Sequence, residues 1–388
     1  MSVTAALGFE AAGVAVGLKS KGGPDVALVV NRGPLDAAAA VFTSNRSKAN
    51  PILWSQEAIK DGRAGAIILN SGGANCFTGA FGFQTTHLTA ELVADLLGVS
   101  AGDVLVASTG LIGEGDELFR ARVLDGVRGA VPALAATAQA GDDASRAIMT
   151  TDTRPKVAVH TSPAGWTIGG MAKGAGMLAP ALATMLVVIT TDAVVDVAAL
   201  DAHLRVAAGQ SFDRLDSDGC TSTNDHVTLM ASGASGVVPD PGAFQSALDA
   251  LTRDLAQQLM RDAEGASHDI TVEVAGAASV ADAVEVGRSV ARNNLFKAAV
   301  FGNDPNWGRV LAAIGTTDAA FDPYDVDVTM NGVRVCHAGG PDRPRTEVDL
   351  SPRALHLLIG LNSGDATATI WTNDLTHDYV HENSAYSS

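Results

Sequence analysis

One stretch of this chain reads Lys173-Gly-Ala-Gly-Met-Leu-Ala-Pro-Ala-Leu-Ala-Thr-Met-Leu-Val-Val-Ile-Thr-Thr-Asp192. The run 185–189 is continuously apolar, which predicts a strand buried on both faces. Two glycines and Pro180 precede it and strain the approach to that strand. Thr184 therefore stands at the mouth of a core strand with its hydroxyl rigidly aimed, and the small Ala183 before it leaves the preceding carbonyl open to attack.

The chemistry available to Thr184 follows from its position. A threonine hydroxyl is a weak nucleophile and needs a base beside it. If it attacks the Ala183 carbonyl, the peptide becomes an ester, and hydrolysis of that ester frees an α-amino group on Thr184. The reference pKa of this amine is about 8, so it suits a general base near neutrality. Self-cleavage would thus create the base, although a threonine that only caps a strand is the simpler interpretation of this segment alone.

A dinucleotide-binding loop is another alternative for this stretch. The run Gly174-Ala-Gly176-Met-Leu-Ala179 has the glycine spacing of that loop, and Asp192 stands roughly where its acid belongs. The connection to the next strand would, however, contain Pro180 and only a few residues. Parallel strands need a crossover of about a dozen residues or more, usually a helix. We therefore reject this interpretation and expect no cofactor.

The bulk composition is that of an ordered globular protein, with 388 residues, 47% hydrophobic and 18% charged. The net charge of −17 argues against nucleic acid or an anionic membrane as partner, because no basic surface would release counterions. The N-terminus has no basic leader. The most apolar stretch falls short of the ~18 residues expected of a membrane span. We expect a cytoplasmic protein.

Metal and disulfide sites are disfavoured by the same kind of reasoning. Three cysteines are odd in number and far apart, which argues against a disulfide framework or a cysteine-based metal site. The run Asp216-Ser-Asp-Gly219 opens like a calcium loop, but its glycine comes two positions early and the closing glutamate is missing. The histidines show no ligand spacing, and we expect His226 and His268 to be structural. The cysteines are Cys76, Cys220 and Cys336.

Short β-rich runs alternate with longer helical patterns along the chain. The predicted strands are 26–30, 66–69, 104–107, 270–274 and 326–330. The predicted helices are 91–97, 199–208 and 243–260. This pattern indicates an α/β or α+β fold and leaves the strand order open. The polar tail, 371–388, is typical of a frayed end.

Several short motifs accompany the central segment in a fixed order, and each is weak by itself. They are Val41-Phe-Thr43, Asn70-Ser-Gly-Gly-Ala-Asn75 with Thr78-Gly79, Ala107-Ser-Thr-Gly-Leu-Ile-Gly113, Ile148-Met-Thr-Thr-Asp-Thr153, Pro155-Lys156, Ser222-Thr-Asn-Asp225, Asp304-Pro-Asn-Trp-Gly-Arg309, and Tyr379-Val with Asn383-Ser384. Their number and order make the match specific, and it runs nearly end to end. The chain resembles the ornithine acetyltransferase family, also called glutamate N-acetyltransferase, of arginine biosynthesis.

The resemblance implies both a fold and an activity. The fold is a layered α/β/β/α sandwich shared with self-cleaving aminopeptidases, with a smaller C-terminal α/β domain. The activity is a ping-pong transfer in which N-acetylornithine acetylates the threonine and glutamate then takes the acetyl group. Some members also use acetyl-CoA. Cleavage between Ala183 and Thr184 would give an α chain, 1–183, and a β chain, 184–388, assembled as α2β2 or a larger oligomer.

The resemblance also assigns site residues one by one. Thr184 matches the nucleophile, while Thr109 and Gly110 match an oxyanion-hole pair that would steady the tetrahedral oxygen. Without the resemblance, 108–110 would be taken as a turn after a strand ending at Ala107. Lys173 can pair with an α-carboxylate and Glu264 with the cationic group of ornithine. The residues that match substrate contacts are Thr150, Lys173, Thr184, Glu264, Asn383 and Ser388.

The chain departs from the family pattern in three places. It has Asp262-Ala-Glu-Gly-Ala-Ser-His268 where the family usually has Asp-Gly-Glu-Gly-Ala-Thr-Lys, so the glutamate stays while the turn and a basic residue change. Ser388 replaces a common threonine and keeps a hydroxyl, and Cys220 replaces an acid. Two other functions stay open: a self-cleaving amidase or aminopeptidase of the same fold, and a binding or structural protein without catalysis.

Overall fold

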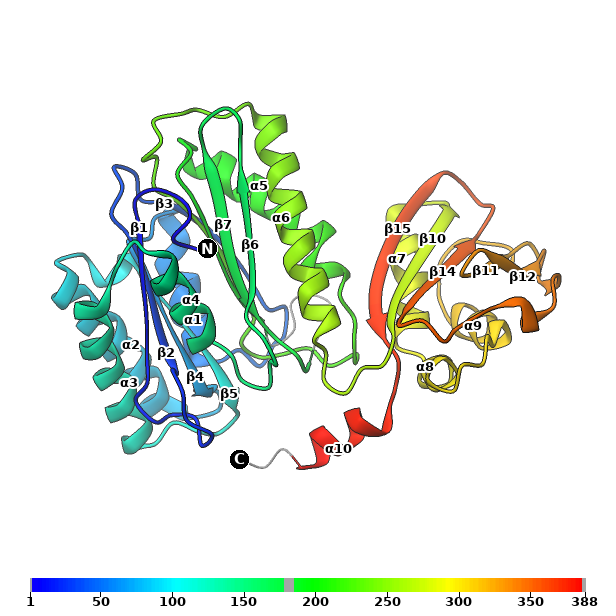
Figure 1. The fold of residues 1–388 in the computed structure, drawn as a ribbon, viewed down its shortest axis with the longest axis horizontal. Helices are drawn as coiled ribbons and strands as arrows, with labels where there is room; N and C mark the ends of the chain where they lie inside the picture. Colours follow the sequence, from blue (N-terminus) through cyan, green and yellow to red (C-terminus); the bar gives the residue numbers. More distant parts are fainter. Residues whose placement is uncertain (1, 178–184, 386–388) are drawn as a thin grey trace.

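Two β-sheets packed face to face form the larger part of the molecule in the computed structural model, which describes residues 2–177 and 185–385 (Figure 1). The first sheet has the order β1-β2-β4-β5, and only its β4–β5 pair is parallel. Its strands are β1 (Phe9–Val14), β2 (Val26–Asn31), β4 (Ala66–Gly73) and β5 (Val104–Leu111). The predictions of strands at 26–30, 66–69 and 104–107 are confirmed.

The second sheet contains the apolar run that follows Thr184. Its order is β3-β9-β8-β7-β6, with β8 parallel to β9 and antiparallel to β7. Its strands are β3 (Ala37–Phe42), β6 (Lys156–Thr161), β7 (Thr167–Lys173), β8 (Leu186–Thr191) and β9 (His226–Ala231). Every residue of β8 is buried, as the continuous apolar run predicted. The antiparallel β7–β8 pair also agrees with the rejection of a dinucleotide crossover.

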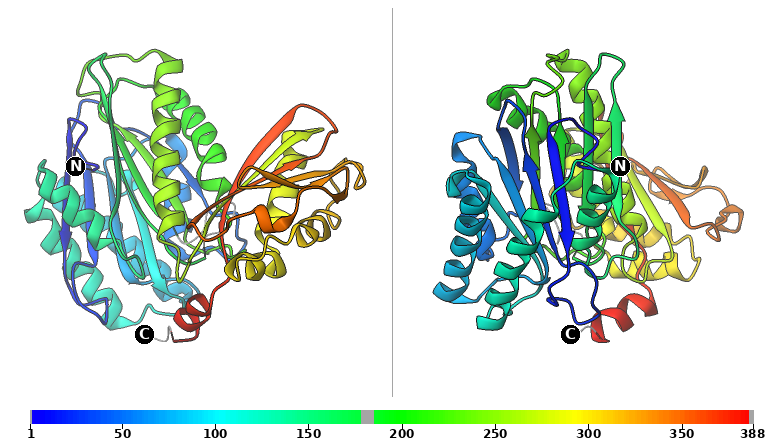
Figure 2. Two further views of the ribbon diagram at one scale, coloured as in Figure 1. Left: turned by 45° about the vertical axis from the view of Figure 1, so that its right-hand side comes forward. Right: turned by 60° about the vertical axis from the view of Figure 1, so that its left-hand side comes forward.

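Helices cover the outer face of each sheet and make four layers (Figure 2). Apolar side chains of both sheets meet in a shared core, which α4 (Ala138–Ala147) also joins. Outside the first sheet lie α1 (Asn50–Ala58), α2 (Gly79–Leu97) and α3 (Glu117–Ala130). Outside the second sheet lie α5 (Val197–Gln210) and α6 (Pro241–Arg261). The α/β/β/α sandwich is therefore confirmed, as are the helices predicted within 91–97, 199–208 and 243–260.

A separate core belongs to a smaller C-terminal domain, also as expected. Its sheet has the order β13-β12-β11-β14-β10-β15. The strands are β10 (Asp269–Ala277), β11 (Asp327–Met330), β12 (Val333–His337), β13 (Gly340–Pro341), β14 (Ala354–Gly360) and β15 (Ala366–Asn373). The helices are α7 (Val280–Ala291), α8 (Asn294–Phe301) and α9 (Trp307–Ile314). The loop before β9 touches this domain through a β-bridge between Leu215 and Trp371.

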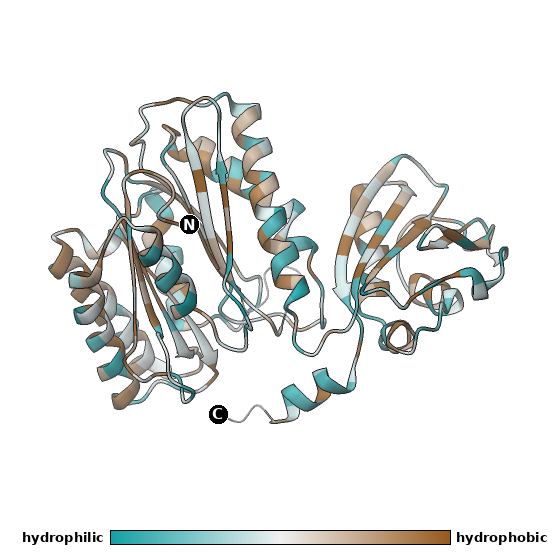
Figure 3. Cartoon of the chain, viewed as in Figure 1, coloured by the Kyte–Doolittle hydropathy of each residue, from teal (hydrophilic) through white to brown (hydrophobic). Residues whose placement is uncertain are grey.

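The expectation of a frayed tail is wrong for most of the segment 371–388. Residues 371–373 complete β15, and a final helix, α10 (His377–Ala385), follows. This helix is almost entirely hydrophilic in Figure 3 and buries no residue fully, so no apolar periodicity announces it in the sequence. It lies beneath both parts of the molecule in Figure 1, and several of its residues line the site described below.

Within the described residues, no helix is both long and apolar enough to cross a membrane. The three cysteines are free, with Cys76 and Cys336 buried and Cys220 exposed. In the same residues, no cluster of three or more His, Cys, Asp or Glu side chains could hold a metal ion.

Candidate active site

One cavity of about 150 Å³ brings together the predicted site residues that the structure describes. We call it the central cavity. The predicted residues that line it are Thr109, Gly110, Thr150, Lys173, Glu264 and Asn383, and Thr151, Gly176 and Met177 complete the lining. Ala183, Thr184 and Ser388 lie outside the described residues. Segments as far apart in sequence as 109 and 383 thus converge on one small space.

Thr109 and Gly110 enter the cavity from the end of β5. The strand does not end at Ala107: it continues to Leu111, and Thr109 and Gly110 pair with Ser71 and Gly72 of β4. The alternative interpretation of 108–110 as a turn, which would apply without the resemblance, is therefore wrong. Gly110 has a φ of 131°, and a Cβ atom on it would lie 2.5 Å from a backbone nitrogen of β4. Only glycine allows the two strands to approach so closely at this point.

Lys173 ends β7 and places a buried ammonium group against two threonines. Its Nζ atom donates hydrogen bonds to Thr150 Oγ1 at 2.8 Å and to Thr109 Oγ1 at 3.3 Å. Burial lowers the pKa of Lys173, while the Asp152 carboxylate 3.9 Å away opposes that shift. A lysine so placed is a donor of hydrogen bonds and a partner for a substrate carboxylate.

Behind Lys173 lies a buried network centred on Asp152. Its carboxylate accepts hydrogen bonds from the backbone N–H groups of Gly174 at 2.7 Å and Thr150 at 3.0 Å, and it pairs with Lys156. Burial opposes ionisation of Asp152, but Lys173 and Lys156 outweigh it and lower its pKa to about 2. Lys156 also pairs with Asp262 at 2.5 Å. Asp152 therefore holds two segments of the cavity wall in place through one carboxylate.

Glu264 forms the opposite wall of the cavity with the C-terminal helix. Its Oε2 atom accepts a hydrogen bond from Asn383 Nδ2 at 3.1 Å, and its backbone N–H donates to the Ala175 carbonyl at 3.0 Å. A Cβ atom on Gly176 would lie 2.5 Å from the Glu264 carboxylate. A Cβ atom on Gly265 would lie 2.2 Å from the backbone nitrogen of Tyr379. Gly176 and Gly265 therefore allow three segments to meet around the Glu264 carboxylate: the loop after β7, the loop after α6, and helix α10.

Two aspartates hold the described residues on either side of 178–184. Asp218 Oδ2 accepts the backbone N–H of Met177 at 2.7 Å, and Asp225 Oδ1 accepts that of Met185 at 3.1 Å. Burial raises the pKa of both carboxyl groups. Asp225 closes the Ser222-Thr-Asn-Asp225 motif, so this part of the motif fixes the start of β8.

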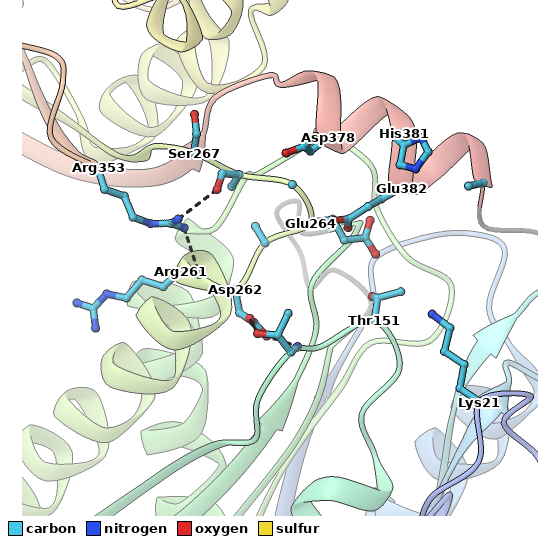
Figure 4. Close-up of a pocket in the computed structure, with 15 residues that line it drawn as sticks. Lys21, Thr151, Arg261, Asp262, Glu264, Ser267, Arg353, Asp378, His381 and Glu382 are labelled. Carbon is cyan, nitrogen blue, oxygen red and sulfur yellow. Dashed lines mark hydrogen bonds between the residues drawn. The ribbon is translucent and has the colours of Figure 1, made fainter.

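A larger cavity, about 730 Å³, adjoins the central one and shares Thr151 and Glu264 with it (Figure 4). We call it the outer cavity. Asp378, His381 and Glu382 of α10 lie on one side of it and Lys21 on the other. It opens the site to substrates larger than the central cavity alone could hold.

Sequence reasoning missed the residues that support the site without matching a substrate contact: Asp152, Lys156, Asp218 and Tyr379. Asp152 and Lys156 lie in quoted motifs, but a charged residue gives no sequence signal that it is buried.

The segment 262–268, which departs from the family pattern, is held by hydrogen bonds. Ser267 and His268 both bond Asp374, which confirms a structural role for His268. Residues 304–309, one of the motifs quoted from the sequence, line neither the central nor the outer cavity.

Comparison with known sequences relates the whole chain to one protein family. A sequence profile of the ArgJ family matches residues 10–388. The protein of Streptomyces coelicolor named arginine biosynthesis bifunctional protein ArgJ is 60% identical over 388 residues, with both chains fully covered. Its namesake from Thermobifida fusca is 57% identical with the same coverage, and that of Mycobacterium leprae is 54% identical over 100% of this chain and 96% of its own.

Two solved structures of similar proteins each match about half of the chain. Ornithine acetyltransferase from Mycobacterium tuberculosis, complexed with ornithine, is 50% identical, covers 48% of this chain and 96% of its own, and has a TM-score of 0.45. A Bacillus halodurans protein named arginine biosynthesis bifunctional protein ArgJ is 33% identical, covers 51% and 97%, and has a TM-score of 0.48.

Proposed function

This chain belongs to the ArgJ family of acyltransferases, and we propose that it moves the acetyl group of N2-acetylornithine to glutamate through an acetyl ester on Thr184. The proposal includes self-cleavage between Ala183 and Thr184 and a role in arginine biosynthesis. The central cavity carries it: a hydroxyl and backbone N–H pair, a buried ammonium and a carboxylate line one small space.

In the first half-reaction, the Thr184 hydroxyl attacks the acetyl carbonyl of N-acetylornithine. Thr109 and the Gly110 N–H would receive the tetrahedral oxygen, and loss of one such donor typically costs about 10²–10³-fold in rate. The C–N bond then breaks, a proton passes to the leaving nitrogen, and ornithine departs. Lys173 would hold the α-carboxylate and Glu264 the side-chain ammonium during this step.

In the second half-reaction, the α-amino group of glutamate attacks the acetyl ester. The ester C–O bond breaks, the threonine oxygen takes up a proton, and N-acetylglutamate leaves. The α-amino group freed on Thr184 by self-cleavage would serve as the base in both halves, since its reference pKa of about 8 suits proton transfer near neutrality. Thr184 thus first opens the chain and then carries the acetyl group.

The test is a two-stage assay with denaturing mass spectrometry. The purified protein should consist of two fragments divided after Ala183, and Thr184→Ala should give one intact, inactive chain. With N-acetylornithine alone, the fragment that begins at Thr184 should gain one acetyl group while ornithine is released. Added glutamate should then yield N-acetylglutamate. Acetate as the main product, without N-acetylglutamate, would favour an amidase of the same fold and contradict our proposal.

The word bifunctional in the relatives' names is a reason to assay a second acetyl donor. We propose acetyl-CoA with glutamate for this assay. Formation of N-acetylglutamate and free CoA in the absence of N-acetylornithine would establish that route for this chain.

A further inference from the structure

A third cavity, about 200 Å³ in volume, lies against the central cavity and shares Glu264 with it. We call it the side cavity. Its wall comes from the loop at Ser217 and Asp218, from α8 of the C-terminal domain through Lys297, and from Tyr379 of α10. It therefore lies where the sandwich meets the smaller domain, and boundaries between domains are preferred places for ligands.

The central cavity is too small to hold either proposed substrate fully, and its charged groups do not match the side chains of both. At about 150 Å³ it is below the ~300–1,000 Å³ usual for ligand pockets, so a substrate must extend into a neighbouring space. Among the described residues of its lining, Lys173 is the only cation, and both substrates offer it an α-carboxylate. Glu264 suits the side-chain ammonium of the donor, and no second cation among the described lining residues of the central cavity offsets its repulsion of the glutamate side-chain carboxylate, whereas Lys297 and Arg292 do so in the side cavity.

Lys297 supplies a buried positive charge next to Glu264. The side chain is 4% exposed, and its Nζ atom donates to the Ser217 carbonyl and, at 3.3 Å, to Thr372 Oγ1. Among the described residues, these contacts use two of the three N–H groups of the ammonium. Burial lowers the pKa of Lys297 to about 8, against the effect of Asp218 and other nearby carboxylates. At neutral pH the group therefore keeps most of its charge inside the side cavity.

We propose that the side cavity is the acceptor subsite, in which Lys297 receives the side-chain carboxylate of glutamate. The inference rests on the proposed function and adds to it that different residues bind the side chains of the donor and the acceptor. Glu264, on the shared wall, receives the cationic end of the donor, and Lys297, one cavity further, receives the anionic end of the acceptor. One active site can then accept two amino acids whose side chains carry opposite charges.

Other cations near the site are poorer candidates. Arg292 lines the side cavity but is about half exposed and paired with Asp216 at 2.8 Å. Lys21 lines the outer cavity and is exposed to solvent. Arg353, also in the outer cavity, is bound to Asp269 and two backbone carbonyls. Matched lysine controls come instead from outside the three cavities: Lys48, which donates to Gln56 Oε1 at 3.0 Å, and the exposed Lys60.

The experiment compares Lys297→Met with Lys48→Met and Lys60→Met in the full-length protein. The donor half-reaction is followed as ornithine release from N-acetylornithine alone, and the acceptor half-reaction as kcat/KM for glutamate and for neutral glutamine. We expect Lys297→Met to lower the ratio of the glutamate to the glutamine value by roughly 10- to 100-fold, because a charged hydrogen bond is lost. Ornithine release and both control variants should stay near the values of the unmodified protein.

The outcomes separate the two proposals. If the unmodified protein releases no ornithine from N-acetylornithine, the proposed function fails. If ornithine release is normal but Lys297→Met leaves the glutamate-to-glutamine ratio unchanged, only the acceptor subsite is overturned. The acceptor subsite is likewise overturned if Lys48→Met or Lys60→Met lowers the ratio instead.

If Lys297→Met does not fold, the proposal is tested instead by the pH dependence of the glutamate-to-glutamine ratio of kcat/KM in the unmodified enzyme. The ammonium loses its proton as pH rises through about 8, and each kcat/KM is first corrected for the titration of the α-amine of its own free amino acid. The ratio should therefore fall between about pH 7 and about pH 10, and a constant ratio would overturn the proposal. The charged and titratable groups that line this cavity with Lys297 are Asp218, Asp374, Arg292, Glu264 and Tyr379, and Asp216 and Cys220 also act on its charge from outside the lining.

Discussion

Asp152 illustrates how a single buried carboxylate can organise the site at the scale of one residue. It links Lys156, on the side away from the cavity, to the backbone of Thr150 and Gly174 and to the ammonium of Lys173. Asp262 is the second carboxylate on Lys156, but its other partner is Thr153, which does not line the central cavity. The two aspartates share one lysine, but only Asp152 bonds residues that line the central cavity, whereas Asp262 and Thr153 line the outer cavity.

This difference leads to a prediction for Asp152→Asn and Asp262→Asn. Each variant leaves Lys156 with one carboxylate fewer, and breaking a buried ion pair costs about 3–5 kcal/mol, so the free energy of unfolding in urea should fall in both. Only Asp152→Asn should also lower kcat/KM for N-acetylornithine, by about tenfold or more, since roughly 1.4 kcal/mol of lost positioning suffices. Equal losses of kcat/KM in the two variants would show that Asp152 is merely structural.

The sequence revealed the site residues only where a motif carried them. Thr109, Gly110, Lys173 and Glu264 are ordinary residue types, and without the family pattern each would be assigned to a turn or a solvated surface. Lys156 shows why the rest could not be found. A lysine is buried only when paired, and its partners lie 4 and 106 residues away in sequence. Such a pairing is a property of the folded chain, not of any local pattern.

At the scale of elements, α10 is the piece of structure that the sequence concealed. Strands such as β8 are predictable because their side chains are continuously apolar, and α6 because its apolar residues recur at helical spacing. In contrast, α10 has no buried residue to produce such a pattern. It is attached by a few polar contacts instead, among them the Thr376 hydroxyl, which donates to the Gly265 carbonyl at 2.6 Å and accepts from the Tyr379 N–H at 2.9 Å.

We expect Thr376→Val to loosen α10 and weaken substrate binding. Valine keeps the shape but loses both hydrogen bonds, and loss of a helix cap typically costs about 0.5–2 kcal/mol. Asn383 should then leave Glu264 more often, which raises KM for N-acetylornithine several-fold and speeds amide hydrogen exchange in 377–385.

Ser279→Ala is the control for this prediction. Ser279 caps α7 by accepting the Asp282 N–H at 3.1 Å, so its loss should cost similar stability without changing KM. A Thr376→Val enzyme with unchanged KM would show that α10 does not need this anchor.

At the scale of the whole molecule, the proposed cut would not separate two domains. The segments 1–183 and 184–388 both contribute to the five-stranded sheet, in which β3, β6 and β7 come from the first and β8 and β9 from the second. The β3–β9 and β7–β8 ladders would therefore join the two fragments, and the apolar core between the sheets draws on both. Separation would require disruption of two ladders and of a shared core, which amounts to unfolding the sandwich.

We therefore predict that the two fragments stay together after cleavage. The protein should elute as one species in native size-exclusion chromatography and give two masses only under denaturing conditions. Uncut Thr184→Ala should elute at the same volume, because the sandwich is complete with or without the peptide bond at 183–184. Native mass spectrometry of the same samples would count the fragment pairs and test the expected α2β2 or larger assembly. Release of a free 1–183 fragment on dilution in native buffer would contradict the prediction that the shared sheet holds the two fragments together.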